Sequence, residues 1–130
     1  MKYVVKSELL GFEGITEVEL SSVDDLFSTL HGINDGVKTA FTLVNPYILR
    51  EYSFDVPSSI KALLDIKEDS NIRVYNIAVL KNPIDESLVN FLAPIVFNED
   101  NNTMAQVVLD VRRHVDFGFA EPLKDFRVAS

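Results

Sequence analysis

The sequence predicts a mainly β fold: a small antiparallel β-barrel-like domain with two short helices. Its short apolar runs are rich in Val, Ile, Phe, Tyr and Thr, and turn residues separate them. Helical patterns are few and short, and the crossover helices that a parallel α/β fold requires are missing. The runs expected to form strands are Tyr3–Val5, Glu17–Leu20, Thr39–Val44, Ile72–Leu80, Leu88–Phe97 and Ala105–Val111.

The run Ile72–Leu80 shows the clearest strand alternation, with Val74 and Asn76 on one face and Tyr75 and Ile77 on the other. Residues 98–102 read Asn-Glu-Asp-Asn-Asn between two apolar runs, which predicts a hairpin loop. Pro94 has no N–H to give to a ladder, so it predicts a sheet edge or a bulge.

Two segments carry the helical patterns. In Ser22–Leu30, apolar residues recur at positions 23, 26, 27 and 30, with an N-cap signal before them and Gly32 after them. We therefore expect a helix there that covers one end or face of the sheet. A second helix is expected to begin at Pro57, with residues 60, 63 and 64 turned inward.

Length and composition narrow the class of protein. At 130 residues, the chain fits a single domain over residues 1–130, in which residues 115–130 have no assigned structure. A net charge of −8 argues against direct binding of nucleic acid and favours a basic partner, although the same charge also keeps a small protein soluble. The absence of cysteine, of a signal-peptide pattern and of an apolar run long enough to cross a membrane predicts a cytoplasmic protein.

The sequence offers little catalytic chemistry. It has no cysteine and only two histidines, His31 and His114, which are far apart, so we expect no metal site. No nucleophile elbow, phosphate-binding loop or dinucleotide fingerprint occurs. The sequence therefore predicts a binding protein without cofactors rather than an enzyme.

Several polar or turn-forming residues look structural. Asn90 interrupts an apolar run, where an unpaired amide would cost about 1–3 kcal/mol, so we expect its side chain to be buried and bonded to backbone. Asn45 and Pro46 form a turn signal directly after an expected strand.

Five segments, in order and at matching spacing, resemble the signatures of the FliW family, in a form similar to its Helicobacter and Campylobacter branch. The structural motif residues within them are Gly11, Phe12, Asn45, Pro46, Asn90, Pro94 and Gln106. The segments are Leu9–Glu13 (LLGFE), Phe41–Pro46 (FTLVNP), Tyr52–Pro57 (YSFDVP), Val89–Asn98 (VNFLAPIVFN) and Asn101–Asp110 (NNTMAQVVLD).

The resemblance implies a compact β-barrel-like flagellar assembly factor with two protein partners. Family members bind CsrA, a translational repressor, beside its RNA site and so free flagellin mRNA. Unexported flagellin captures the assembly factor and restores repression. The alternative is a dedicated flagellin chaperone, which would need an apolar groove; the aromatic residues available for it, which could equally be core, are Phe12, Tyr47, Tyr52, Phe117, Phe119 and Phe126.

Acidic side chains are the candidates for contact with CsrA. The segment 65–70 carries Asp65, Glu68 and Asp69 in an expected exposed turn, and Glu51 and Asp55 lie nearby in sequence. Charges at the rim of an interface mainly raise the association rate. A turn that is simply solvated is the alternative interpretation of the same residues.

Overall fold

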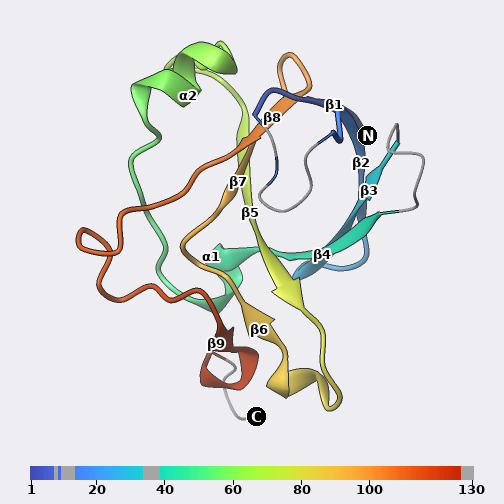
Figure 1. Cartoon of the computed structure of the whole chain (residues 1–130), viewed down its shortest axis with the longest axis vertical. Coiled ribbons are helices and arrows are strands. Elements are labelled where there is room, and N and C mark those ends of the chain that lie inside the picture. Colours follow the sequence, from blue (N-terminus) through green and yellow to red (C-terminus); the bar gives the residue numbers. More distant parts are fainter. Residues whose placement is uncertain (8, 10–13, 34–38, 127–130) are drawn as a thin grey trace.

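In the computed structural model, nine strands and two short α-helices are assigned within the described residues, which are 1–7, 9, 14–33 and 39–126 (Figure 1). The strands are β1 (Lys2–Val5), β2 (Glu17–Ser22), β3 (Phe27–Gly32), β4 (Ala40–Val44), β5 (Ile72–Val79), β6 (Leu88–Val89), β7 (Ile95–Asn98), β8 (Thr103–Gln106) and β9 (Glu121–Pro122). The helices are α1 (Pro46–Leu49) and α2 (Ser58–Leu63), and the 3-10 turns are η1 (Ile84–Glu86) and η2 (Leu123–Asp125).

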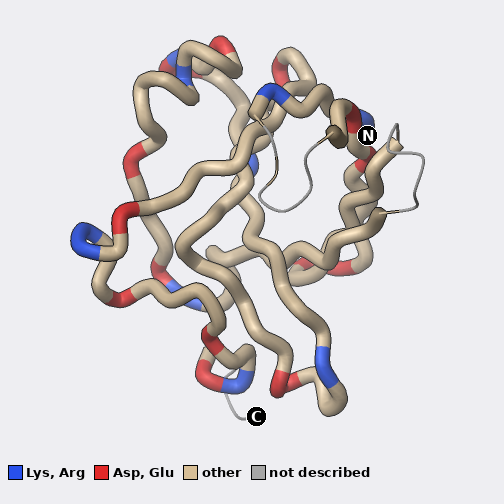
Figure 2. Tube along the Cα trace, viewed as in Figure 1, with Lys and Arg blue, Asp and Glu red and all other residues tan. Residues whose placement is uncertain are grey.

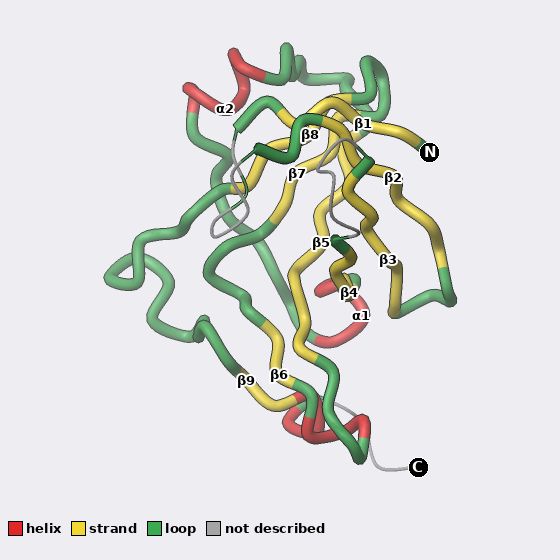
Figure 3. Tube along the Cα trace, turned by 45° about the vertical axis from the view of Figure 1, so that its right-hand side comes forward, coloured by secondary structure: helices red, strands yellow, loops and turns green. Residues whose placement is uncertain are grey.

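Seven of these strands close into a barrel. The hydrogen-bonded order runs β4-β3-β2-β1-β8-β7-β5, and β5 pairs again with β4 to complete the ring. The pair β1–β8 is parallel, whereas the other pairs of the ring are antiparallel. The strands β6 and β9 extend the sheet outward from β5 and lie at the lower end of the molecule (Figures 1 and 3). The predicted barrel is confirmed.

The hydrophobic core has two layers that share one wall of the barrel. The inner cluster contains residues from β1, β2, β3, β4, β7 and β8, together with Leu9 and Ile15. The outer cluster lies on the other face of β5, β7 and β8, under the segment between β4 and β5 and under the chain that follows β8. Because successive residues of a strand face opposite ways, Ile95 and Phe97 fill the inner cluster while Val96 belongs to the outer one.

The predicted hairpin loop joins β7 to β8 and also anchors the end of α2. Asn98 is buried and its Nδ2 donates to the carbonyl oxygen of Leu64 (2.9 Å), as does Nδ2 of Asn101 (2.9 Å). A helix leaves its last carbonyl groups without partners, so these two amides satisfy one of them. The loop therefore holds α2 against the barrel wall.

The helix predicted at Ser22–Leu30 is wrong: this segment is the end of β2, a turn and most of β3. Oδ1 of Asp24 accepts from the backbone N–H groups of Leu26 (2.9 Å) and Phe27 (2.7 Å), which closes the turn. Leu30 does reach the core, but Val23 is 66% exposed. Ladders to β2 and β4 supply more backbone hydrogen bonds than an isolated short helix could, so pairing overrides the helical spacing.

Other boundaries also differ from the prediction. The predicted strand Leu88–Phe97 is divided into β6 and β7. Residues 90–94, the last of which is Pro94, belong to neither strand. The strand predicted at Ala105–Val111 is β8, which begins earlier, at Thr103, and ends earlier, at Gln106. Near Pro57, α2 forms as expected, with Leu64 buried and Ile60 half-buried, but Leu63 is 42% exposed.

Residues 115–126, which no sequence pattern assigned, form part of the outer core layer. Leu123 is fully buried, and Phe117 and Phe126 pack against the outer cluster. The chain of this region runs down one side of the molecule and returns to pair with β6 through β9 (Figure 1).

Candidate partner-binding surface

The five acidic residues predicted to bind a partner are all exposed, on two separate stretches of chain. Glu51 and Asp55 lie on the segment between α1 and α2, which runs outside the barrel up to the end that carries α2 (Figures 1 and 2). Asp65, Glu68 and Asp69 follow α2. Along the chain, α2 separates the two groups.

The turn after α2 has a defined shape. Asp65 adopts a positive φ of 55°, the left-handed conformation that often ends a helix. The backbone N–H of Ile66 donates to Lys61 (2.8 Å), and that of Lys67 donates to Oγ of Ser70 (2.8 Å). The ion pair between Lys67 and Asp65 is long (4.0 Å) and exposed, so it contributes little. The turn presents Glu68 and Asp69 to solvent from a fixed backbone.

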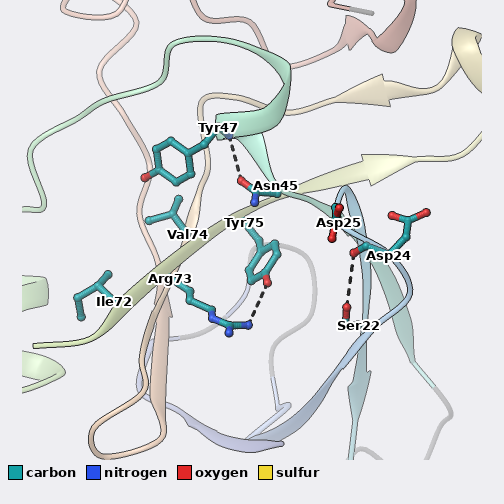
Figure 4. Close-up of a pocket in the computed structure, with 9 residues that line it drawn as sticks. All are labelled: Ser22, Asp24, Asp25, Asn45, Tyr47, Ile72, Arg73, Val74 and Tyr75. Atoms are coloured by element: carbon teal, nitrogen blue, oxygen red, sulfur yellow. Dashed lines mark hydrogen bonds between the residues drawn. The ribbon is translucent and has the colours of Figure 1, made fainter.

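A polar cavity of about 420 Å³ lies between the β2–β3 turn, the start of α1 and β5 (Figure 4). The β2–β3 turn contributes Asp24 and Asp25, and the tyrosines Tyr47 and Tyr75 and the cation Arg73 line the rest. Nη1 of Arg73 donates to the hydroxyl of Tyr75 (3.4 Å), and this bond raises the pKa of Arg73. Arg73 also forms an ion pair with Glu99.

This cavity combines carboxylate, guanidinium and phenol groups. Asp24 already accepts two backbone hydrogen bonds, so its charge also holds the turn. Burial raises the pKa of Tyr47 above its ordinary value of 10.0. A tyrosine hydroxyl is neutral near pH 7 in any case, and it can donate or accept a hydrogen bond. Across the described residues, no group of three or more His, Asp or Glu side chains could hold a metal ion.

A buried polar network fixes the chain beside β5. The hydroxyl of Tyr52 donates to the carbonyl oxygen of Phe91 (2.6 Å), and Nδ2 of Asn76 donates to the Tyr52 hydroxyl (3.2 Å) and to the Asn90 carbonyl oxygen (2.9 Å). Burial is the main reason why the pKa of Tyr52 rises to about 12. Oδ1 of Asn76 is buried and accepts no hydrogen bond from the described residues.

Asn90 lies at the edge of this network and is half-buried. Its Oδ1 accepts from the backbone N–H of Leu92 (3.0 Å), and its own N–H donates to Ile77 (3.0 Å). The side chain thus bonds to backbone, as the sequence predicts, although it is less deeply buried than expected. Asn90 shapes the stretch between β6 and β7.

The other motif residues that the structure describes lie at the start of α1 and beside the stretch that precedes β7. Asn45 caps α1, because its Oδ1 accepts from the N–H of Tyr47 (3.0 Å), and Pro46 is the first helical residue. Pro94 is buried and its carbonyl accepts from Val107 (2.8 Å). Gln106 donates through Nε2 to Ala93 (3.2 Å). Gly11 and Phe12 lie outside the described residues.

Arg50, which no sequence pattern singled out, lies at the centre of an aromatic cluster. Its guanidinium carbon is 4.8 Å from the ring centre of Phe117, 5.0 Å from that of Phe91 and 5.1 Å from that of Phe126. Its Nη1 is 3.2 Å from Oε2 of Glu121 and its Nη2 donates to the Asp116 carbonyl (3.2 Å). We call these five residues, Arg50, Phe91, Phe117, Glu121 and Phe126, the Arg50 clasp.

An apolar patch lies on the outside of the barrel near the β2–β3 turn. Val23, Leu80 and Ile84 are 66%, 49% and 41% exposed and border a cavity of about 180 Å³ that Phe27 and Thr42 also line. Exposed apolar side chains in one place often mark a surface that meets another protein. Among the described residues, no helix is both long and apolar enough to cross a membrane.

These features define a class: a small, closed β-barrel whose described cavities are lined by polar, aromatic and apolar side chains. The family profile described as FliW protein matches residues 2–122. Flagellar assembly factor FliW 1 of Wolinella succinogenes is 51% identical over 126 residues, covering 97% of this chain and 98% of that protein. Flagellar assembly factor FliW 1 of Helicobacter pylori HPAG1 is 48% identical over 129 residues, covering 98% and 96%.

The chain belongs to the FliW family of flagellar assembly factors. The fold agrees with this assignment. A crystal structure of the flagellar assembly factor FliW matches with a TM-score of 0.84 at 22% identity, covering 99% of this chain and 88% of the other. The family predicted from the five motifs is confirmed.

Proposed function

We propose that this chain is a non-catalytic, cytoplasmic regulator that binds CsrA, antagonises its repression of flagellin mRNA, and exchanges CsrA for flagellin. Membership of the FliW family across nearly the whole chain carries this proposal. In this scheme, flagellin that awaits export captures the protein, and released CsrA represses again. Neither direct contact with nucleic acid nor membrane insertion is part of the function.

The charge of the chain supports a basic partner. Twenty acidic residues against twelve basic ones give a net charge of −8, and five of the carboxylates project from the segment before α2 and the turn after it. A protein of this charge attracts a basic surface and repels RNA phosphates nearby. It can therefore disfavour the RNA-bound state of CsrA without occupying the RNA site.

The test is a three-component binding experiment with the purified chain, CsrA and a labelled leader RNA of flagellin mRNA. The chain should release the RNA from CsrA in a concentration-dependent way, measured by gel mobility. Added flagellin should return CsrA to the RNA. RNA that stays on CsrA at saturating concentrations of the chain would contradict the proposal.

A dedicated flagellin chaperone is the second candidate, and the apolar patch at Val23, Phe27, Leu80 and Ile84 favours it. An amphipathic helix of flagellin could lay its apolar face there. The aromatic residues considered for such a groove are divided: Tyr47 and Phe119 are exposed, whereas Tyr52 is buried and Phe117 and Phe126 belong to the Arg50 clasp. A chaperone would keep flagellin soluble and leave the CsrA–RNA complex intact.

A further inference from the structure

Strand β5 extends beyond its neighbour β4, which leaves part of one edge of β5 open. The pairing with β4 covers only residues 76–78 of β5. Residues 72–75 are paired with β7 on one side and, within the described residues, with no strand on the other. The turn that ends β4 explains this difference. If the register continued, Pro46 would lie opposite Val74, but Pro46 begins α1 and has no N–H to donate.

Two residues of β5 point their backbone groups to this open edge. The N–H of Glu99, directly after β7, donates to the carbonyl of Asn71 (2.9 Å), so the backbone of Asn71 faces β7. Successive residues of an antiparallel strand direct their backbone groups to opposite edges, so Ile72 and Val74 face away from β7. Neither makes a backbone hydrogen bond on that side with the described residues. Their N–H and carbonyl groups are therefore available to another strand.

The open edge borders the polar cavity of about 420 Å³ described above (Figure 4). Residues 72–75 all line this cavity, together with residues of the β2–β3 turn and of the start of α1. An extended segment that enters the cavity would occupy the position beside β5 that β4 leaves at Pro46.

The charged groups around the cavity leave an excess of negative charge. Asp24, Asp25 and Arg73 line it, and Arg73 is already paired with Glu99. Three carboxylates against one guanidinium give a net charge of −2. Oδ1 of Asp24 holds the turn, whereas Asp25 is exposed and makes no ion pair or hydrogen bond with the described residues. Met1 borders the adjoining smaller cavity, and its amino group already donates to a backbone carbonyl (3.0 Å).

We propose that an extended segment of CsrA adds to β5 in this cavity, pairs its backbone with Ile72 and Val74, and places a basic side chain beside Asp25. The inference deepens the proposed function and rests on it, since it assigns a surface to the contact with CsrA. When an extended segment joins an unpaired strand edge, main-chain hydrogen bonds supply the affinity.

Charge selects CsrA as the occupant. A protein that binds RNA neutralises phosphates with lysine and arginine, so its function requires basic side chains at its surface. The function of flagellin as a filament subunit places no such demand on its surface, and a second copy of this acidic chain would be repelled. The exposed turn that carries Glu68 and Asp69 leads directly into Ile72, so further carboxylates lie at the end of the same edge.

The first test removes the unpaired carboxylate. Asp25→Asn keeps the shape of the side chain and should weaken binding of purified CsrA about tenfold in calorimetry, because the basic side chain loses its counter-charge. Glu19→Gln is the matched control, since it removes one exposed negative charge from β2 outside the cavity, and it should change the affinity less than twofold. Equal losses for the two variants, or no loss for Asp25→Asn, would overturn the proposal.

The second test compares Ile72→Pro with Ile72→Ala. Proline removes the N–H that the fold leaves unused, and the first residue of a strand tolerates proline. Alanine keeps the N–H and also removes most of the isoleucine side chain. Ile72→Pro should weaken binding of CsrA about tenfold, whereas Ile72→Ala should change it less than twofold. Equal affinities for the two variants would show that this edge does not pair with CsrA.

Amide hydrogen exchange of the unmodified chain keeps the pairing testable if Ile72→Pro does not fold. In the free chain, the N–H groups of Ile72 and Val74 should exchange faster than those of Arg73 and Tyr75, which face β7. Adding CsrA should slow exchange at Ile72 and Val74 and so remove this alternation.

The same measurement separates the inference from the proposed function. If CsrA binds but protects only other residues, the inference is overturned and the proposed function stands. Protection of Ile72 and Val74 by flagellin, or by a higher concentration of the chain alone, would assign the edge to flagellin or to a second copy and overturn the assignment to CsrA. Absence of CsrA binding by the unmodified chain would contradict both the inference and the proposed function.

Discussion

Arg50 and Glu121 are 71 residues apart in sequence, yet their side chains pair at 3.2 Å within the outer layer of the protein. The Arg50 side chain is 18% exposed and that of Glu121 is 25% exposed. Glu121 Oε2 also accepts from the backbone N–H of Gly118 (2.8 Å). One carboxylate thus ties the loop before β9 to the segment after α1, and aromatic rings surround the arginine.

Replacing Arg50 by alanine should therefore loosen the last part of the chain. The change leaves Glu121 without its cation and removes three cation–π contacts, so the free energy of unfolding should fall by about 2 kcal/mol. Urea unfolding measures the loss, and limited proteolysis should show faster cleavage between residues 111 and 122. Arg112→Ala is the control, because that side chain is 88% exposed, and it should cost about 0.5 kcal/mol or less.

Tyr52→Phe should destabilise the protein by about 1–2 kcal/mol, since it leaves the carbonyl of Phe91 without its donor and removes one of the two acceptors of the Asn76 amide. Tyr47→Phe is the control, because Tyr47 is 54% exposed and makes no hydroxyl hydrogen bond with the described residues. Thermal unfolding should give a clearly lower midpoint for Tyr52→Phe than for Tyr47→Phe. Similar midpoints would show that the buried network contributes little.

The pKa of Tyr52 also predicts a pH dependence. Burial raises this pKa to about 12, whereas an unfolded tyrosine titrates near its ordinary value of 10.0. The unfolded state therefore loses its proton first, and stability falls as the pH rises from about 10 through 12, by on the order of 2 kcal/mol. Below pH 10 the contribution is complete. Tyr52→Phe should remove this part of the alkaline loss in urea unfolding curves; an unchanged alkaline slope would assign it to other groups.

Asn90→Leu should lower the free energy of unfolding by about 1–2 kcal/mol, because Leu92 then loses the acceptor for its N–H. Partner preference should barely change, since the role of the side chain is to shape backbone. Asn90→Asp keeps an acceptor oxygen and should retain most of the stability. A change in the affinity ratio for CsrA and flagellin without loss of stability would show that Asn90 contacts a partner.

Reversal of Glu68 and Asp69 to lysine tests the turn after α2. If this turn faces CsrA, association should slow several-fold at low ionic strength, and the difference should shrink with added salt. The melting temperature should hardly move, because both carboxylates are exposed. Glu19→Lys with Asp125→Lys carries the same change of net charge elsewhere and is the control for stopped-flow kinetics. Equal association rates for the two double variants would show that this turn is exposed to solvent and does not contact CsrA.

The barrel was predictable because its strands show their period in sequence. Ile72–Val79 buries Val74, Asn76 and Ala78 on the face expected, with Tyr75 and Ile77 on the other. The turn Asn98–Asn102 was likewise visible from its composition. Asn76 shows how far the sequence could be used. The face of the strand on which it lies was predictable, but its hydrogen-bond partners, Tyr52 and Asn90, lie on segments distant in sequence.

The predicted helix and the missed Arg50 clasp have different physical origins. Leu26, Phe27 and Leu30 have helical spacing, but in the barrel Leu26 and Phe27 face the outer cluster and Leu30 the inner one. A chain that buries both faces of its sheet produces apolar patterns that do not distinguish helix from strand. The Arg50 clasp gave no sequence signal, because an arginine and three phenylalanines far apart in sequence have no local period.

The parallel pair β1–β8 joins Val4 to Thr103 and Val5 to Met104. During synthesis, the first strand emerges early, but its neighbour on this side is made only after most of the chain has left the ribosome. Until then the ring stays open, and β1 and β2 can form no more than a partial sheet with β3 and β4. Such distant pairing makes closure a late and comparatively slow event, so the newly made protein passes through a period in which its strand edges need protection.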